Sequence, residues 1–137
     1  SEPRHLTTEG GNYPRWSPDG RYIAYISIVA NSLLLISPDG GERRVLVHVE
    51  DPSARPVPVF PEWSPDSRTV YYHAKNEENR SSIWAVPVEG GEPKMLVDFD
   101  DSSRPASREV FATDGKAFYF TLPKRESDIW LMELVSN

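Results

Sequence analysis

WSPDGRYIAY, residues 16–25, recurs along the chain and predicts its fold. It returns as WSPDSRTVYY at residues 63–72 and in a weaker form as FATDGKAFYF at residues 111–120, so that the copies begin 47 and 48 residues apart. A repeat of this length is typical of proteins built from stacked copies of one supersecondary unit, none of which buries its apolar face alone. The sequence therefore predicts a repeat architecture.

Each copy has the pattern of a β-hairpin. The SPDG turn at residues 17–20 contains a proline that fixes φ, an aspartate that bonds to its own backbone and a glycine suited to positive φ. Residues 21–26, which follow, are rich in β-branched and aromatic side chains, as strands are. The second copy has Ser67 in place of the glycine, and a positive φ there would cost about 1 kcal/mol of backbone strain.

Two further strand-like segments complete each unit. The third strand is expected at residues 33–37, 83–88 and 129–134, and the matching segments 4–7, 44–47 and 94–97 are expected to form the outer strand. Four short strands with glycine-rich turns in roughly 40 to 50 residues are typical of a β-propeller blade. A β-sandwich is the competing all-β interpretation, but its strands do not carry one turn at a fixed long period.

We therefore predict an all-β fold of β-propeller blades, with three four-stranded antiparallel repeats that make a partial or half propeller. The repeats span approximately residues 12–48, 59–97 and 108–134, and residues 4–7 are expected to serve as a closing outer strand. The last copy runs out after its third strand.

The composition bounds the class of protein. The chain has 137 residues, a net charge of −6 and 38% hydrophobic residues, as one globular domain has. A nucleic-acid partner is not expected, because binding to phosphates needs clustered basic residues. The chain has no cysteine, and its longest apolar run, residues 33–36, is far too short to span a membrane. No signal segment opens the sequence, and we expect no membrane insertion.

The residues also carry a family resemblance. WSPDGRYIAY followed by LLLISPDGGERRVLV, and WSPDSRTVYY followed by IWAVPVEGGEPKMLV, resemble the TolB-like (WD-like) β-propeller repeat. The third copy departs from the motif, with Phe111, Ala112 and Thr113 in place of Trp, Ser and Pro. The resemblance implies a four-stranded blade, a binding platform and a periplasmic or extracytoplasmic location. It assigns no partner, because this repeat accompanies kinases, peptidases, transcription regulators and secretion proteins.

No catalytic motif is found in the sequence. A G-x-S-x-G elbow, an H-E-x-x-H helix, a P-loop and EF-hand spacing are all missing, so we predict no catalytic residue, no metal and no cofactor. His5, His48 and His73 fall at unrelated repeat positions and are assigned no role.

Two other residue sets invite a functional interpretation. The acidic loop Asp98–Asp101 could offer oxygens to calcium, but it lacks the glycine and the distal glutamate of a calcium loop. The tryptophans at repeat-equivalent positions are expected to pack between blades rather than to bind a carbohydrate or a peptide: Trp16, Trp63, Trp84 and Trp130.

One face of the predicted propeller collects the variable loops, because successive strands are antiparallel. Two of these loops share the pattern S-x-R-P, at residues 53–56 and 102–105, which places Arg55 and Arg104 near the mouth of the central channel. There they could take a carboxylate or an acidic peptide, or each could pair with an acid such as Asp51 or Asp101. The candidate binding residues on this face are Asn12, Tyr13, Arg55, Arg104 and Arg108.

Two functions remain open. The leading hypothesis is a non-catalytic binding or scaffold domain that presents its variable loops to a protein or peptide, as part of a larger receptor or exported protein. The alternative is the gating propeller of a prolyl-oligopeptidase-type hydrolase whose catalytic domain is absent here. Open blade flanks also predict a homodimer of two half-rings, in which residues 4–7 of each chain complete the last blade of the other. The alternative is that the chain is the C-terminal part of a longer one, whose other blades cover the same flanks.

Overall fold

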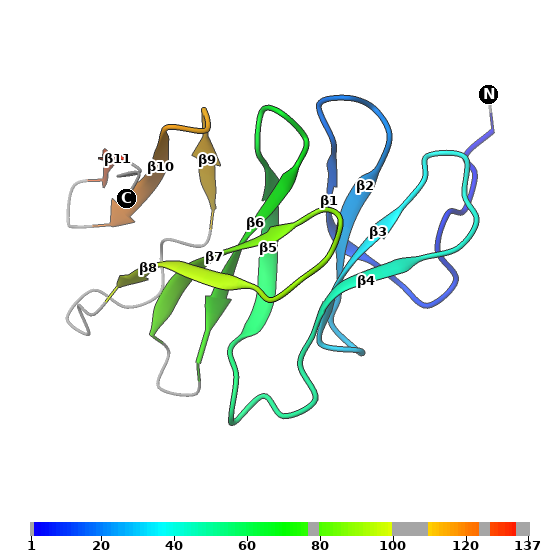
Figure 1. Ribbon diagram of the computed structural model, residues 1–137, viewed down its shortest axis with the longest axis horizontal. Helices are drawn as coiled ribbons and strands as arrows, with labels where there is room; N and C mark the ends of the chain where they lie inside the picture. The colour runs from blue at the N-terminus through cyan, green and yellow to red at the C-terminus, as the bar shows by residue number, and fades with distance from the viewer. Residues whose placement is uncertain (1, 77–79, 100–109, 124–126, 134–137) are drawn as a thin grey trace.

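The computed structural model describes residues 2–76, 80–99, 110–123 and 127–133, and these residues form three antiparallel sheets (Figure 1). In the first two sheets the strands follow chain order, and the third has the order β11-β10-β9. The strands are β1 (Asn12–Trp16), β2 (Ile23–Ser27), β3 (Ser32–Ile36), β4 (Arg44–His48), β5 (Val57–Trp63), β6 (Thr69–Lys75), β7 (Ser81–Pro87), β8 (Lys94–Phe99), β9 (Phe111–Thr113), β10 (Ala117–Pro123) and β11 (Ser127–Glu133).

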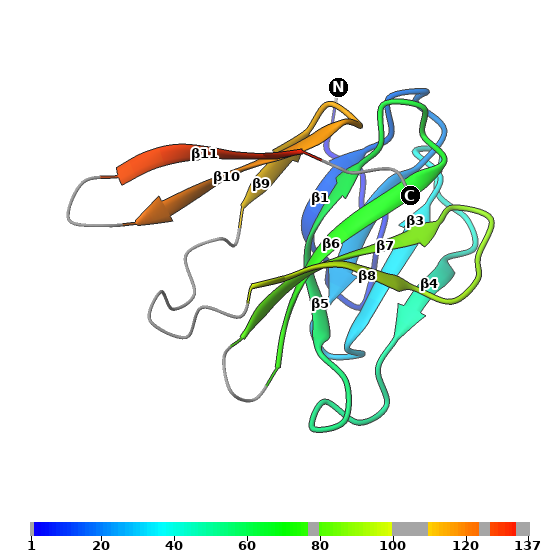
Figure 2. The ribbon, with the colours of Figure 1, turned by 60° about the vertical axis from the view of Figure 1, so that its left-hand side comes forward.

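The three sheets, here called blades 1, 2 and 3, lie side by side in chain order (Figures 1 and 2). Strand β5, the first of blade 2, packs against β1 on one side and β9 on the other, so the first strands of the blades adjoin. The predicted fold is confirmed: the chain is all-β, and its sheets of four, four and three strands resemble the blades of a partial propeller. The turns β1–β2, β5–β6 and β9–β10 lie at the same end of the three blades (Figure 1).

The core lies between the blades. Side chains of blade 1, among them Ile26, Leu33 and Leu35, pack against Trp63 and Val70 of blade 2. A second cluster joins blade 2 to blade 3 and contains Tyr71, Ile83, Phe99, Phe111, Phe118 and Phe120. Because each sheet buries its apolar faces on its neighbours, a single blade has no core of its own.

The SPD turns are fixed by their own side chains. The Ser17 hydroxyl donates to the Asp19 carboxylate (2.7 Å), and this carboxylate also accepts from the Arg21 N–H (3.0 Å). In the second copy, Ser64 and Asp66 form the same bond at 2.7 Å. These hydrogen bonds lower the pKa of Asp19 and Asp66, because they stabilise the charged form.

Ser67 occupies the glycine position of the second turn. Its φ is 60°, so the backbone has the positive φ for which strain was expected. Its hydroxyl also accepts a hydrogen bond from the Asp19 N–H (3.1 Å), which joins the turns of blades 1 and 2. The serine therefore offsets its backbone strain with a contact that glycine cannot make.

We expect Ser67→Ala to lower the free energy of unfolding by about 1 kcal/mol, because it keeps the strain and loses the hydrogen bond. Ser67→Gly should stay within about 0.5 kcal/mol of the natural chain, because the relieved strain offsets the lost bond. Urea unfolding of both variants measures the difference. A clear gain of stability in Ser67→Gly would mean that the bond to Asp19 contributes nothing.

The outer flank of blade 1 differs from the same flank of blade 2. Trp63 is 4% exposed, whereas Trp16, at the equivalent position, is 59% exposed. The prediction that the tryptophans pack between blades is therefore confirmed for Trp63 and wrong for Trp16. Trp84 packs against the cluster between blades 1 and 2, and the side chain of Trp130 lies outside the described residues.

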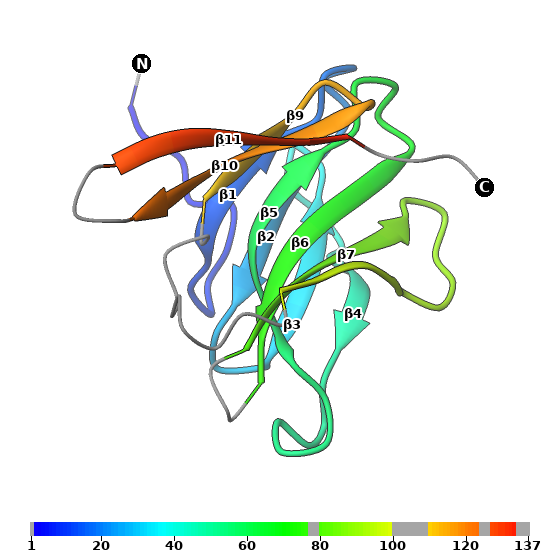
Figure 3. The ribbon, with the colours of Figure 1, turned by 90° about the vertical axis from the view of Figure 1, so that its left-hand side faces the viewer.

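The N-terminal segment covers part of that flank. Leu6 packs against Tyr25, Leu34 and Ile36, and the Arg4 guanidinium donates to the Pro38 carbonyl. Residues 4–7 form no strand within this single chain, so their predicted pairing with the last blade of a second chain stays a prediction. Figure 3 shows the N-terminal segment beside blade 1.

Candidate binding site between blades 1 and 2

The connection from β4 to β5, residues 49–56, carries Arg55 and is ordered by Asp51. The Asp51 carboxylate accepts from the Ser53 N–H (2.9 Å) and the Ser53 hydroxyl (2.6 Å), and its backbone carbonyl accepts from the Arg55 N–H (3.1 Å). The hydrogen bonds from Ser53 lower the pKa of the Asp51 carboxyl. The carboxylate of Asp51 thus serves the turn and forms no ion pair with Arg55.

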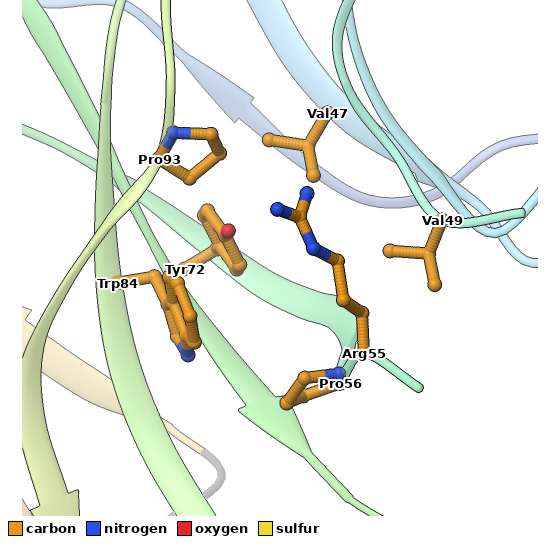
Figure 4. Close-up of a pocket in the computed structure, with 7 residues that line it drawn as sticks. All are labelled: Val47, Val49, Arg55, Pro56, Tyr72, Trp84 and Pro93. Carbon is orange, nitrogen blue, oxygen red and sulfur yellow. The ribbon is translucent and has the colours of Figure 1, made fainter. Parts of the chain in front are cut away.

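Arg55 points into a small cavity between the two blades (Figure 4). Among the described residues its guanidinium has no hydrogen-bond or ion-pair partner. The cavity measures about 30 Å³, which is room for one small polar group. It is lined by Val47, Val49, Arg55, Pro56, Tyr72, Trp84 and Pro93.

Tyr72 of β6 forms the floor of this cavity. Its side chain is 3% exposed and stacks on Trp84, with the ring centroids 6.4 Å apart and an interplanar angle of 12°. The Trp84 Nε1–H donates to the Ser82 hydroxyl (2.8 Å), which fixes the indole. The Tyr72 hydroxyl points toward Arg55 (Figure 4), and within the described ranges no hydrogen-bond partner of this hydroxyl is found.

Burial raises the pKa of the Tyr72 hydroxyl, and the neighbouring Arg55 lowers it by less. The hydroxyl therefore stays protonated at neutral pH and is available as a donor. Two donors, one charged and one neutral, thus face the same cavity.

A wider depression of about 440 Å³ adjoins the cavity at Arg55. It shares Val49 and Arg55 with the cavity and is otherwise lined by His48, Glu50, Asp51 and Ala54. The site thus has the cationic side chain of Arg55 at the cavity and the acidic side chains of Glu50 and Asp51 in the adjoining depression.

Asn12 and Tyr13 do not line the cavity beside Arg55. Asn12 and Tyr13 lie on the inner strand β1, where Tyr13 has a φ of 53° and its ring centroid lies 4.3 Å from that of Phe60. The side chain of Arg55 lies against residues of β4, β6 and β7. Arg104 and Arg108 lie outside the described residues.

Sequence reasoning missed Tyr72 and Trp84 as partners of Arg55. Both stand in apolar strands at repeat-equivalent positions, so their pattern indicated core packing. Only the S-x-R-P motif at residues 53–56 pointed to this region of the chain.

The histidines and the acidic loop form no metal-binding group in the part of the chain that the structure describes. His48 shares hydrogen bonds with the Ser32 hydroxyl (2.9 Å) and the Ala30 carbonyl (3.0 Å). Asp98 pairs with Arg80 (3.2 Å), and Asp100 and Asp101 lie outside the described ranges. Within the described ranges no three metal-binding side chains lie together, and no helix is long and apolar enough to cross a membrane.

Comparison with solved structures supports the β-propeller fold. The chain superposes on TolB from Acinetobacter baumannii with a TM-score of 0.66 and 20% identity, covering 91% of this chain and 30% of that one. The three sheets are thus structurally similar to β-propeller blades of TolB. The β-propeller domain of the Trilobed protease from Pyrococcus furiosus gives a TM-score of 0.62 at 16% identity, over 90% of this chain and 38% of the other.

A sequence relative corrects the predicted function. The chain is 40% identical over 123 residues to the Uncharacterized peptidase YuxL of Bacillus subtilis (strain 168), which is 84% of this chain and 18% of that protein. No protein-family model matches the chain. This likeness overturns the leading hypothesis of a non-catalytic binding or scaffold domain, together with the prediction that the protein is not an enzyme. It favours the alternative, a propeller segment of a hydrolase.

Proposed function

We propose that this chain is a three-blade segment of the propeller of a peptidase, whose catalytic residues lie outside these 137 residues. The observation that carries the proposal is the 40% identity to the Uncharacterized peptidase YuxL. The chain spans about a fifth of that relative, so the activity belongs to the longer protein.

The role of the segment in such an enzyme would be to control which peptides reach the catalytic domain. The inter-blade clusters hold the blades together, hydrogen bonds also join blades 1 and 2, and the loops at their rim are the variable part of the repeat. The sequence itself contains no nucleophile motif, which agrees with a role in access rather than in bond cleavage.

The proposal is tested with the full-length protein that contains this segment. Chromogenic aminoacyl and short peptidyl amides should be hydrolysed by the full-length protein and not by the 137-residue chain alone. Long, unfolded polypeptides should be cleaved much more slowly than tetrapeptides of the same local sequence. The proposal is wrong if no peptide amide is hydrolysed, and the gating role is wrong if chain length makes no difference.

For the 137-residue chain by itself we further propose self-association through the blade edges. Two observations support this. Trp16 on the flank of blade 1 is exposed, and so are Ile129 and Leu131 on blade 3. The equivalents of Ile129 in blades 1 and 2, Leu33 and Ile83, are fully buried by the next blade. Exposed apolar faces of this kind are typical of surfaces that bind another protein surface.

A further inference from the structure

Two hydrogen-bond donors without partners meet at the cavity between blades 1 and 2 (Figure 4). One is the guanidinium of Arg55, whose side chain is exposed, and the other is the hydroxyl of Tyr72, whose side chain is almost entirely buried. Both side chains line the cavity, so an acceptor seated in it can bond to the two donors together.

The cavity walls themselves offer no acceptor side chain. Val47, Val49, Pro56 and Pro93 are apolar, and the Trp84 indole is already bonded to Ser82. An anion with two oxygens would accept from the guanidinium fork and from the phenol at once. A carboxylate also fits the small volume of the cavity, which is close to that of one or two polar atoms.

The adjoining depression indicates the charge of the rest of the ligand. Glu50 and Asp51 line it, and the Asp51 carboxyl is held in its charged form by Ser53. A ligand that spans both regions therefore needs a negative end at Arg55 and a positive end toward these acids. An amino acid or a short peptide has both, as its terminal carboxylate and its terminal ammonium.

We propose that the groove between blades 1 and 2 binds the free carboxylate of a short zwitterionic peptide through Arg55 and Tyr72. The inference rests on the proposed peptidase function for the source of such peptides, which are the products of peptide hydrolysis. Phosphate is disfavoured, because its two charges would face Glu50 and Asp51 without a balancing ammonium.

The third copy of the repeat indicates a substitution that the fold should tolerate. Phe120 of blade 3 stands at the position of Tyr72 and is buried, so Tyr72→Phe removes only the hydroxyl. Arg55→Gln removes the charge at an exposed position and should leave the fold intact. Arg68→Gln, in the exposed β5–β6 turn, is the matched control that loses the same charge elsewhere.

Binding of alanyl-alanine to the chain is measured by calorimetry and by the NMR signal of the Trp84 indole N–H. We expect saturable binding that weakens about tenfold or more when the dipeptide is C-terminally amidated or when Arg55 becomes glutamine. Tyr72→Phe should weaken it about three- to tenfold, and Arg68→Gln should leave it unchanged.

The proposal is overturned if the amide binds as tightly as the free dipeptide, if inorganic phosphate binds more tightly, or if no saturation appears below about 10 mM. Because this measurement involves no hydrolysis, a failure to bind leaves the peptidase proposal standing. Conversely, binding by the chain together with an inactive full-length protein would remove the peptidase proposal and keep the carboxylate site.

Discussion

Replacement of Trp63 by alanine is expected to lower the free energy of unfolding by about 3–5 kcal/mol, the usual cost of removing a buried aromatic side chain. The indole is 4% exposed in the cluster between blades 1 and 2, and its Nε1–H donates to the Arg15 carbonyl (2.9 Å). Trp63→Ala opens a cavity and leaves that carbonyl without its donor. Urea unfolding followed by circular dichroism measures the loss.

The matched control is Trp16→Ala, the same substitution at the equivalent position of blade 1. It should cost less than about 1 kcal/mol, because 59% of that side chain is already exposed. Both variants are compared in an Ile129→Asp background, so that self-association does not contribute. Equal losses at the two positions would show that packing between the blades does not stabilise the fold.

The 137-residue chain is expected to form a dimer at micromolar concentration, with a mass of twice 15.5 kDa by light scattering. In the half-ring arrangement, the Trp16 flank of each chain meets the Ile129 and Leu131 flank of the other, in two equivalent contacts. Ile129 is 82% exposed in the single chain, so Ile129→Asp should spare the fold. It should weaken the dimer about 30-fold or more, as loss of a central interface residue does.

A mixing experiment tests the geometry of this dimer. Trp16→Asp and Ile129→Asp each damage both contacts when present in both chains. A mixed dimer has one contact with neither change, so mixing the two variants should restore part of the association. Val29→Asp, at a 93% exposed position in the β2–β3 turn, is the control that should leave the dimer unchanged.

Two results would contradict the half-ring dimer. A monodisperse monomer at these concentrations would mean that the N-terminal segment packed on Tyr25 and Leu34 already covers the flank sufficiently. A dimer that tolerates both aspartate variants would use another surface. Deletion of residues 2–8 separates the remaining possibilities, because it weakens the dimer only if these residues are exchanged between the chains.

The functional prediction from sequence failed for a physical reason. The absence of a nucleophile motif describes only the residues present, and a propeller does not need to contain the chemistry that it serves. Identity of 40% to the Uncharacterized peptidase YuxL carried the information that the search for motifs in this segment lacked.

The sequence alone determined the repeat, the strand order and the turns. These features follow from local chemistry, since Ser17, Asp19 and Gly20 fix their turn through bonds within a few residues. The same locality made the positive φ of Ser67 predictable from one substituted glycine.

Only the tertiary structure decided the environment of each repeated side chain. Trp16 and Trp63 stand in the same motif, yet one is exposed and the other buried, because the neighbouring blade and not the motif covers them. The meeting of Arg55 with Tyr72 arises in the same way. Arg55 stands on the connection between two blades and Tyr72 within a strand, and only the packing of blade 1 on blade 2 brings the guanidinium to the hydroxyl.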